Sequence, residues 1–204
     1  MQGLYDYIIK PLGDRYNNKT SVEGKELILN AEVFNHEFVN RKAVVLSVPK
    51  SINTEVKVGD IIITHHNVFR RWHDVRGVEK NSRSYYKEDQ YFIKHDQIFA
   101  YKRSSAWSRF KESNWKALKG YCFIKPIKST DKFSTEKEKP LVGIVKYTDG
   151  SVDIGDLVGF KPGSKYEFII DGERLYRVFS NFITIKYEYQ GDEEEYNPSW
   201  TEGS

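Results

Sequence analysis

An aliphatic triplet, Leu27-Ile28-Leu29, is the strongest candidate for a functional site, because the segment around it is mostly polar or charged. Gly24 and the polar run from Asn17 to Ser21 disfavour local order in this segment. Burying an aliphatic side chain contributes roughly 1.5–3 kcal/mol, whereas fixing the backbone of a residue costs roughly 1–2 kcal/mol. The triplet therefore predicts weak binding to an apolar groove of a partner. The alternative is that Glu26–Phe34 is an ordinary strand with Leu27 and Leu29 facing the core.

The residues that usually carry catalysis or bind metals form no recognisable site. His65 and His66 are adjacent, so in a strand they point to opposite faces and cannot share a metal. His73 has no partner at a spacing typical of zinc, and Cys122 is the only cysteine. The chain contains no G-x-S-x-G, H-E-x-x-H, phosphate-loop or G-x-G-x-x-G motif. We therefore expect no enzyme, metal site or cofactor, and we expect Cys122 to be a buried, inert thiol.

Composition and charge narrow the class of protein. The 204 residues are 39% hydrophobic and 30% charged, with 32 basic and 29 acidic residues, so the net charge of +3 is too small to favour nucleic acid. No run approaches the roughly 20 apolar residues that span a bilayer, and the first residues, MQGLYDYIIKP, lack the basic and apolar regions expected of a secretory signal. A single cysteine fits a reducing compartment. The expectation is a soluble cytoplasmic protein that binds neither membrane nor nucleic acid.

The elements that position these residues are expected to be short strands. Aromatic residues make up 15% of the chain and alternate with Val, Ile and Thr, which favour a pleated surface. Gly, Asp and Asn interrupt the runs, as in Val58-Gly59-Asp60 and Ile154-Gly155-Asp156. This pattern predicts an all-β sandwich or barrel. The best helix candidate is Ser104–Leu118, where the apolar spacing is only loosely helical.

Three blocks of sequence recur in the same order. The first pair is Tyr7–Leu12 and Cys122–Ile127, the second is Val56–Ile62 and Val152–Val158, and the third is Asp96–Tyr101 and Asn181–Lys186. The repeat predicts two copies of one small β-domain, residues 1–103 and 115–190, with a linker at 104–114 and an acidic, aromatic tail at 191–204. Gly59 and Gly155 are expected in equivalent turns.

Differences in spacing locate two insertions in the first copy. Pro11 and Pro126 are 115 residues apart, but Gly59 and Gly155 are 96 apart, so the first copy holds 19 more residues, largely in a loop at 16–42. Ile98 and Ile183 are 85 apart, which places 11 more after Gly59, roughly at 69–86. Long loops in compact domains are usually functional. The second insertion mixes cations with aromatic residues, as nucleic-acid grooves do, although a solvated loop or subunit contact is favoured.

The motifs of the first copy resemble the chaperonin-10, or GroES-type, co-chaperonin family. Ile9-Lys10-Pro11-Leu12-Gly13-Asp14-Arg15 is similar to the family's opening I-x-P-L-x-D-R, and Gly24 with the triplet is similar to its mobile loop. Lys42–Val48, Val56–Ile62 and Asp96–Ala100 follow in the family's order. The resemblance implies two tandem GroES-like small β-barrel domains. It also implies that Leu27, Ile28 and Leu29 bind a GroEL-type chaperonin, and that a homo-oligomeric ring of subunits assists ATP-dependent protein folding.

Some features depart from the family pattern. Only Pro49–Glu55 are available where the family's roof hairpin would lie, and the acidic tail has no counterpart. The tandem arrangement resembles the double co-chaperonins of chloroplasts, and the shortened roof suggests a viral or phage version. The main alternative function is therefore a structural component of a virus or phage particle, built from GroES-like barrels without chaperonin binding. A nucleic-acid-binding β-barrel is ranked last.

Overall fold

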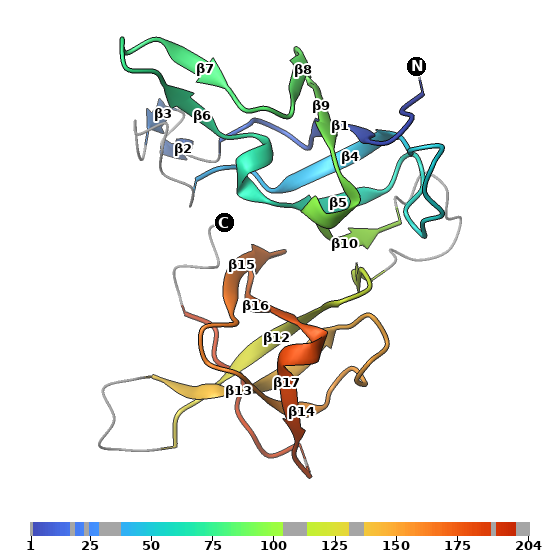
Figure 1. Ribbon diagram of the computed structural model, residues 1–204. Coiled ribbons are helices and arrows are strands. Elements are labelled where there is room, and N and C mark those ends of the chain that lie inside the picture. The colour runs from blue at the N-terminus through green and yellow to red at the C-terminus, as the bar shows by residue number, and fades with distance from the viewer. Residues whose placement is uncertain are drawn as a thin grey trace. The chain divides into compact units, whose positions relative to one another are not determined.

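The protein is all-β (Figure 1). The structure is a computed structural model that describes residues 2–16, 19–22, 25–28, 38–103, 114–130, 137–188 and 191–198, with only the backbone for 19–22 and 26–28. Within these residues the regular structure consists of strands and short 3-10 turns, and no α-helix occurs. The chain divides into two compact units, Met1–Trp115 (unit 1) and Lys116–Ser204 (unit 2).

The main sheet of unit 1 is antiparallel, with the strand order β10-β5-β4-β1-β9-β8. Its strands are β1 (Tyr7–Pro11), β4 (Lys42–Ser47), β5 (Ile61–Thr64), β8 (Tyr85–Lys87), β9 (Gln90–Ile93) and β10 (Ile98–Lys102). On β4, Ala43, Val45 and Ser47 are buried, whereas the residues between them are more exposed. This period of two places one face of the strand against the core.

Unit 2 contains an antiparallel sheet with the strand order β17-β14-β13-β12-β16-β15. Its strands are β12 (Tyr121–Lys128), β13 (Glu138–Tyr147), β14 (Leu157–Phe160), β15 (Tyr166–Ile170), β16 (Glu173–Phe179) and β17 (Ile183–Lys186). A two-residue strand, β11 (Lys116–Ala117), precedes β12.

The two units have the same strand order, and their pairing registers agree except between β8 and β9, where unit 1 has an irregularity that β15 and β16 lack. β1, β4, β5, β8, β9 and β10 correspond to β12, β13, β14, β15, β16 and β17. Ile9 pairs with Val45 as Ile124 pairs with Val145, and an irregularity in register precedes Ile9 and Ile124 alike. The sequence repeat therefore corresponds to a structural repeat of one strand topology.

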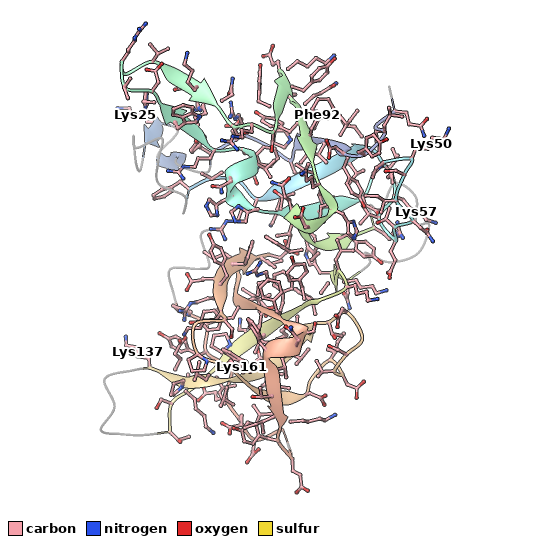
Figure 2. The ribbon with its side chains drawn as sticks, in the orientation of Figure 1. Lys25, Lys50, Lys57, Phe92, Lys137 and Lys161 are labelled. Atoms are coloured by element: carbon pink, nitrogen blue, oxygen red, sulfur yellow. The ribbon has the colours of Figure 1, made fainter. Side chains whose placement is uncertain are left out.

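The prediction that Gly59 and Gly155 occupy equivalent turns is confirmed. Both have positive φ, 86° and 92°, a conformation that glycine adopts without steric cost. The N–H of Gly59 donates to the carbonyl of Val45 at 2.8 Å, and that of Gly155 donates to Val145 at 2.8 Å. In each turn the following aspartate accepts a hydrogen bond from the backbone N–H three residues earlier, at Lys57 (labelled in Figure 2) or Asp153.

The end of the repeat is also the same in both units. A 3-10 turn, η2 (His95–Gln97) or η4 (Ser180–Phe182), leads into the last strand of the sheet. The N–H of His65 donates to the carbonyl of Gln97 at 3.1 Å, and the N–H of Lys161 donates to Phe182 at 3.0 Å (Figure 2). This bond ties the end of β5 or β14 to the closing segment.

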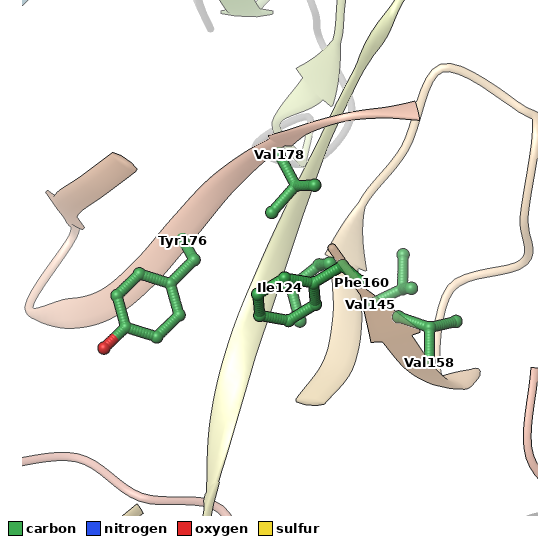
Figure 3. Packing of buried hydrophobic residues seen from close by; sticks show 6 residues of the cluster. All are labelled: Ile124, Val145, Val158, Phe160, Tyr176 and Val178. Atoms are coloured by element: carbon green, nitrogen blue, oxygen red, sulfur yellow. The ribbon is translucent and has the colours of Figure 1, made fainter. Parts of the chain in front are cut away.

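The cores of the two units use equivalent positions. In unit 2, six buried residues from four strands pack together (Figure 3): Ile124, Val145, Val158, Phe160, Tyr176 and Val178. The equivalent residues of unit 1 are also buried: Ile9, Val45, Ile62, Thr64, Tyr91 and Ile93. Each aliphatic side chain buried in this way stabilises its unit by roughly 1.5–3 kcal/mol.

Each predicted insertion carries a small hairpin of its own. Within 16–42, β2 (Lys19–Val22) pairs with β3 (Lys25–Ile28), and within 69–86, β6 (Arg71–His73) pairs with β7 (Glu79–Asn81). Both hairpins are two-stranded sheets separate from the main sheet. In unit 2, the segment equivalent to the second insertion is the short connection between β14 and β15.

Closed barrels are not observed. Among the described residues, no strand pairing joins β8 to the opposite end of its sheet, and none joins β15 to β17. β8 has only three residues, all exposed, and three of the four residues of β17 are exposed. The expectation from the sequence therefore holds for the all-β class, whereas barrel closure is not confirmed.

The helix expected at 104–118 is wrong at its end, where Lys116–Ala117 forms β11. Trp115 and Leu118 are buried on either side of this strand, so their apolar character reflects core packing rather than a helical face. Residues 104–113 lie outside the described part of the chain, and the predicted domain boundaries stay a prediction.

Residues 49–55, where a roof hairpin would lie, contain no strand.

Candidate functional site

The neck of the predicted loop is closed by main-chain pairing at the end of β1. Tyr16 and Val39 form an antiparallel bridge, and the N–H of Asn40 donates to the carbonyl of Arg15 at 2.9 Å. The buried Asn40 amide donates to the carbonyls of Leu12 and Asp14 at 2.9 and 2.8 Å. Because a buried polar group is retained only when it is hydrogen-bonded, Asn40 fixes the two ends of the loop side by side.

The triplet lies on and just after β3 of the loop hairpin. Leu27 pairs with Thr20 and Ile28 with Lys19, while Leu29 lies outside the described residues. β3 begins at the exposed Lys25 (Figure 2) and pairs with β2 rather than with the main sheet. The role of the three residues in binding stays a prediction.

The β6–β7 hairpin of the second insertion has an ordered turn and an apolar tip. The carboxylate of Asp74 accepts hydrogen bonds from the N–H groups of Arg76 and Val78, both at 2.9 Å. The bond from Val78 lowers the pKa of Asp74 below its ordinary value, with smaller contributions from Arg76 and Lys80. Val75 at the tip is fully exposed, and the side chain of Trp72 is about half exposed, at 46%. The hairpin therefore presents apolar surface on a structured turn.

An arginine joins the two insertions at the neck. Arg15 donates from Nε and Nη2 to the carbonyl of Phe69, at 3.2 and 2.9 Å, and from Nη1 to Oδ1 of Asn81 at 2.8 Å. Its guanidinium lies 5.4 Å from the ring centre of Tyr91. Burial lowers the pKa of Arg15, but an arginine stays charged at neutral pH.

A second contact between the insertions uses Tyr16. Its hydroxyl accepts a hydrogen bond from the N–H of Arg71 at 2.6 Å, and the Arg71 guanidinium lies 4.9 Å from the Tyr16 ring centre. Arg71 also pairs with Glu79 across the β6–β7 hairpin at 2.9 Å. The neck of the first insertion and the base of the second therefore form one connected assembly on the scaffold of unit 1.

Replacing Arg15 with alanine is expected to loosen the β6–β7 hairpin without unfolding unit 1. The carbonyl of Phe69 loses both side-chain donors and Asn81 loses one, which costs roughly 1–3 kcal/mol for groups screened from water. Amide hydrogen exchange over residues 69–87 measures the change. Arg83→Met, at an exposed arginine of the same insertion, is the control and is expected to leave exchange unchanged. Equal exchange in the Arg15 variant and the parent protein would contradict the assigned role of Arg15.

The histidines differ from the expected arrangement. β5 ends at Thr64, and His65 caps the 3-10 turn η1 (His66–Val68), with its Nδ1 accepting from the N–H of Asn67 at 3.1 Å. The strand geometry assumed for His65 and His66 is therefore wrong, and their ring centres lie 4.3 Å apart. In the part of the chain that is described, no three His, Cys, Asp or Glu side chains are grouped so as to hold a metal ion.

Cys122 is fully buried on β12, as expected from its place in the opening strand of the second copy. Its sulfur lies 3.5 Å from the Ser180 hydroxyl and 3.7 Å from the hydroxyls of Thr148 and Ser151. Ser180 in turn donates to Asp149 at 2.8 Å. The thiol is thus part of a polar network that joins three segments of unit 2.

Unit 2 carries a cluster of ion pairs centred on Glu138. Its carboxylate accepts hydrogen bonds from Arg174 at 2.7 Å, from Lys165 at 2.9 Å and from the hydroxyl of Tyr176 at 2.7 and 2.9 Å. Burial opposes ionisation of Glu138, but the bonds from Tyr176 and Lys165 and the charge of Arg174 outweigh it, so the pKa of Glu138 lies below its ordinary value of 4.5. The carboxylate has several donors, which indicates a structural role rather than proton transfer.

The Glu138 cluster predicts acid sensitivity of unit 2. Because the pKa of Glu138 is lower in the folded state, its stabilising contribution is present above about pH 4.5 and is lost as the pH falls through the folded-state pKa. Glu138→Gln is expected to lower the free energy of unfolding at pH 7 and to flatten its decline below pH 5. Urea denaturation of variant and parent across this range measures both effects. Parallel stability curves for the two proteins would contradict the assignment to Glu138.

No family model and no curated protein matches the chain. No helix in the described residues is long and apolar enough to cross a membrane.

The neck residues Arg15, Tyr16 and Asn40 were not among the predicted site residues. Arg15 is the last residue of the opening motif Ile9–Arg15, and its place in that motif was the signal in the sequence that could have identified it.

Proposed function

We infer that the protein is a co-chaperonin-like binding protein that caps a chaperonin ring through the loop at 16–42. In this proposal Leu27, Ile28 and Leu29 are the side chains that enter an apolar groove of a GroEL-type ring. The observation that carries the proposal is the loop's construction: a separate hairpin held on the main scaffold by a closed neck at Tyr16 and Val39. Such a construction suits a segment that binds a partner.

The scaffold supports the same proposal through its repeat. The motif Ile9–Arg15 begins on β1, and Val56–Ile62 contains the glycine turn that unit 2 repeats at Gly155. Two units of one strand topology are what a tandem GroES-like protein would contain. The finer assignment to small GroES-like barrels is part of the proposal, as are a cytoplasmic location and a role without catalysis or cofactor.

Multivalency is needed because one loop binds weakly. Three aliphatic anchors contribute several kcal/mol at roughly 1.5–3 kcal/mol each, and ordering the loop cancels much of this gain. A homo-oligomeric ring that presents several loops at once raises the effective concentration of each loop and binds far more tightly. Weak individual contacts also allow release when the partner changes state.

The direct test mixes the full chain with a GroEL-type chaperonin ring and ATP, and follows the mixture by size analysis and electron microscopy. A cap density on the end of the ring, together with ATP-dependent release of a folded substrate, is the expected result. Complete separation of the two proteins with ATP and without it would overturn the proposal.

A second candidate is a structural component of a viral or phage particle. Two features favour it: the basic β6–β7 insertion and the acidic tail, neither of which has a place in the co-chaperonin pattern. This candidate predicts assembly into large regular particles without a chaperonin. The same electron micrographs, recorded on the protein alone, distinguish the two functions.

A further inference from the structure

The acidic tail of the chain lies along β12 of unit 2 and forms an isolated antiparallel bridge with it. The N–H of Lys128 donates to the carbonyl of Glu194 at 2.8 Å, and the N–H of Tyr196 donates to the carbonyl of Pro126 at 2.8 Å. Ile127 and Glu195, between these bonds, form an antiparallel bridge. The tail is therefore bound by the main-chain pattern of β-augmentation.

The tail bonds to the part of the β12 edge that does not pair with β16. β12 pairs with β13 along one edge as far as Lys128, and with β16 along the other edge only from Tyr121 to Ile124. The main-chain bonds of Pro126 and Lys128 to the tail follow directly on this second edge. Pairing of β16 with β12 ends at Ile124 and Tyr176, and the following part of β12 is the edge to which the tail bonds.

Three lysines match the three consecutive glutamates of the tail. Lys139 pairs with Glu193 at 3.1 Å, Lys146 pairs with Glu195 at 2.8 Å, and Lys128 pairs with Glu194. Lys139 and Lys146 lie on β13 and Lys128 ends β12. Each of the three glutamates from 193 to 195 therefore forms an ion pair with a lysine of unit 2.

An asparagine completes the site after the glutamates. Oδ1 of Asn197 accepts from Nζ of Lys125 and from the N–H of Arg174, both at 3.0 Å, and its amide donates to the carbonyl of Gly172 at 3.2 Å. Pro198, the next residue, is buried. Asn197 thus recognises one lysine and two backbone groups, which provides specificity beyond charge.

Unit 1 supplies an internal comparison for this site. Lys10 and Lys125 occupy equivalent positions, paired with Val44 and Ile144 of the neighbouring strand. Lys10 is exposed, whereas the side chain of Lys125 is only 2% exposed, with Asn197 and Glu173 as its partners. The lysine at this position of the repeat is therefore exposed in unit 1. In unit 2 the tail contributes to the burial of Lys125.

The tail is held by contacts that salt can weaken. The side chains of Lys128 and Glu194 are 48% and 71% exposed, and the other two pairs are partly exposed. Exposed ion pairs contribute little individually and are screened by salt. A competing acidic strand can form the same main-chain bonds and the same ion pairs.

We propose that the Pro126–Lys128 edge, with Lys125, Lys139 and Lys146, is a binding site for an extended acidic peptide, and that residues 191–198 are its intramolecular occupant. An acidic segment of a partner protein binds at this edge when the tail dissociates from it. The ligand class is a strand with consecutive carboxylates followed by an aromatic residue and an asparagine. This inference does not depend on chaperonin binding.

The test uses a fluorescent peptide, GDEEEYNP, that copies residues 191–198. Binding is measured by fluorescence anisotropy with the full chain and with a chain that ends at Gln190. The shortened chain is expected to bind the peptide at least tenfold more tightly than the full chain, and to bind it roughly tenfold more weakly when salt is raised from about 50 to about 500 mM.

Matched controls separate charge from sequence. The peptide GDQQQYNP is expected to bind poorly, and Lys128→Glu in the shortened chain is expected to weaken binding of GDEEEYNP, because it replaces an ion pair with two like charges. Lys119→Glu, at an exposed lysine before the opposite end of β12, is expected to have no effect. A folded shortened chain that does not bind, or that binds both peptides equally, would overturn the proposal.

The full chain provides an independent measurement if the shortened chain does not fold. High salt is expected to accelerate amide exchange at Lys128 and Tyr196, whose N–H groups bond across the site, but not at Val145, whose N–H donates to Asp156 within the sheet. Equal protection of Lys128 and Tyr196 at low and high salt would show that the tail does not leave, and would overturn its role as a displaceable occupant.

Discussion

Ile28→Asp is expected to abolish binding to a chaperonin ring while leaving the fold and the oligomeric state intact. The substitution places a charge where the proposed contact needs an aliphatic side chain, and burying an unpaired carboxylate costs several kcal/mol. Since each 1.4 kcal/mol is a tenfold change in affinity, we expect at least about a hundredfold loss for each loop. A ring of several loops multiplies the effect.

The measurement is retention of the variant on a chaperonin ring in the presence of ATP. Asn18→Asp is a matched control, because it adds the same charge to the same loop outside the triplet. The control is expected to bind as the parent protein does. If Ile28→Asp is retained equally, the triplet is not the contact, and the particle-component function becomes the better explanation of the fold.

Gly143→Ala is expected to destabilise unit 2 by roughly 3 kcal/mol, at the upper end of the usual cost of overpacking a core. A Cβ at Gly143 would lie 2.3 Å from the carbonyl oxygen of Lys125 and 2.6 Å from Cγ2 of Ile124. The first of these atoms belongs to the backbone of the neighbouring strand, so β12 and β13 must separate to admit a methyl group. Urea denaturation, followed by amide exchange at Ile124, measures the loss.

Unit 1 again provides the control. Its equivalent residue is Ala43, which pairs with Pro11 as Gly143 pairs with Pro126 and is fully buried. Ala43→Gly is expected to cost only about 0.5–1 kcal/mol through the entropy of the unfolded chain. Amide exchange in β1 should be unchanged by Gly143→Ala. If unit 2 keeps its parental stability in the variant, the strands at this point are more adaptable than the contact distances imply.

The sequence predicted the repeat well because its turns are determined locally. Gly59 and Gly155 need a positive φ, and each is followed by an aspartate that accepts the N–H of the residue three positions earlier. Such signals lie within a few residues of one another and survive divergence of the strands around them. Differences in spacing between the copies also predicted two insertions, and a hairpin separate from the main sheet lies within each predicted range.

The features that the sequence did not predict depend on partners distant in the chain. Arg15 bonds to Phe69 and Asn81, more than fifty residues away, and the tail lies against Lys125 and Lys128 about seventy residues before it. No local pattern marks such pairs. The end of the helix expected at 104–118 was wrong, since Lys116–Ala117 forms β11 and Trp115 and Leu118 are apolar for tertiary reasons; tertiary packing overrides a weak periodicity.

Because the two units share one strand order, unit 2 shows, within the same molecule, how the sheet folds without the β6–β7 hairpin. Five residues connect β14 to β15 at the place where unit 1 accommodates the whole β6–β7 hairpin between β5 and β8. The scaffold therefore accommodates both lengths of connection with one strand order, and the register differs where β8 pairs with β9. The surface segments that differ between the two units are thus separate from the sheet that the units share.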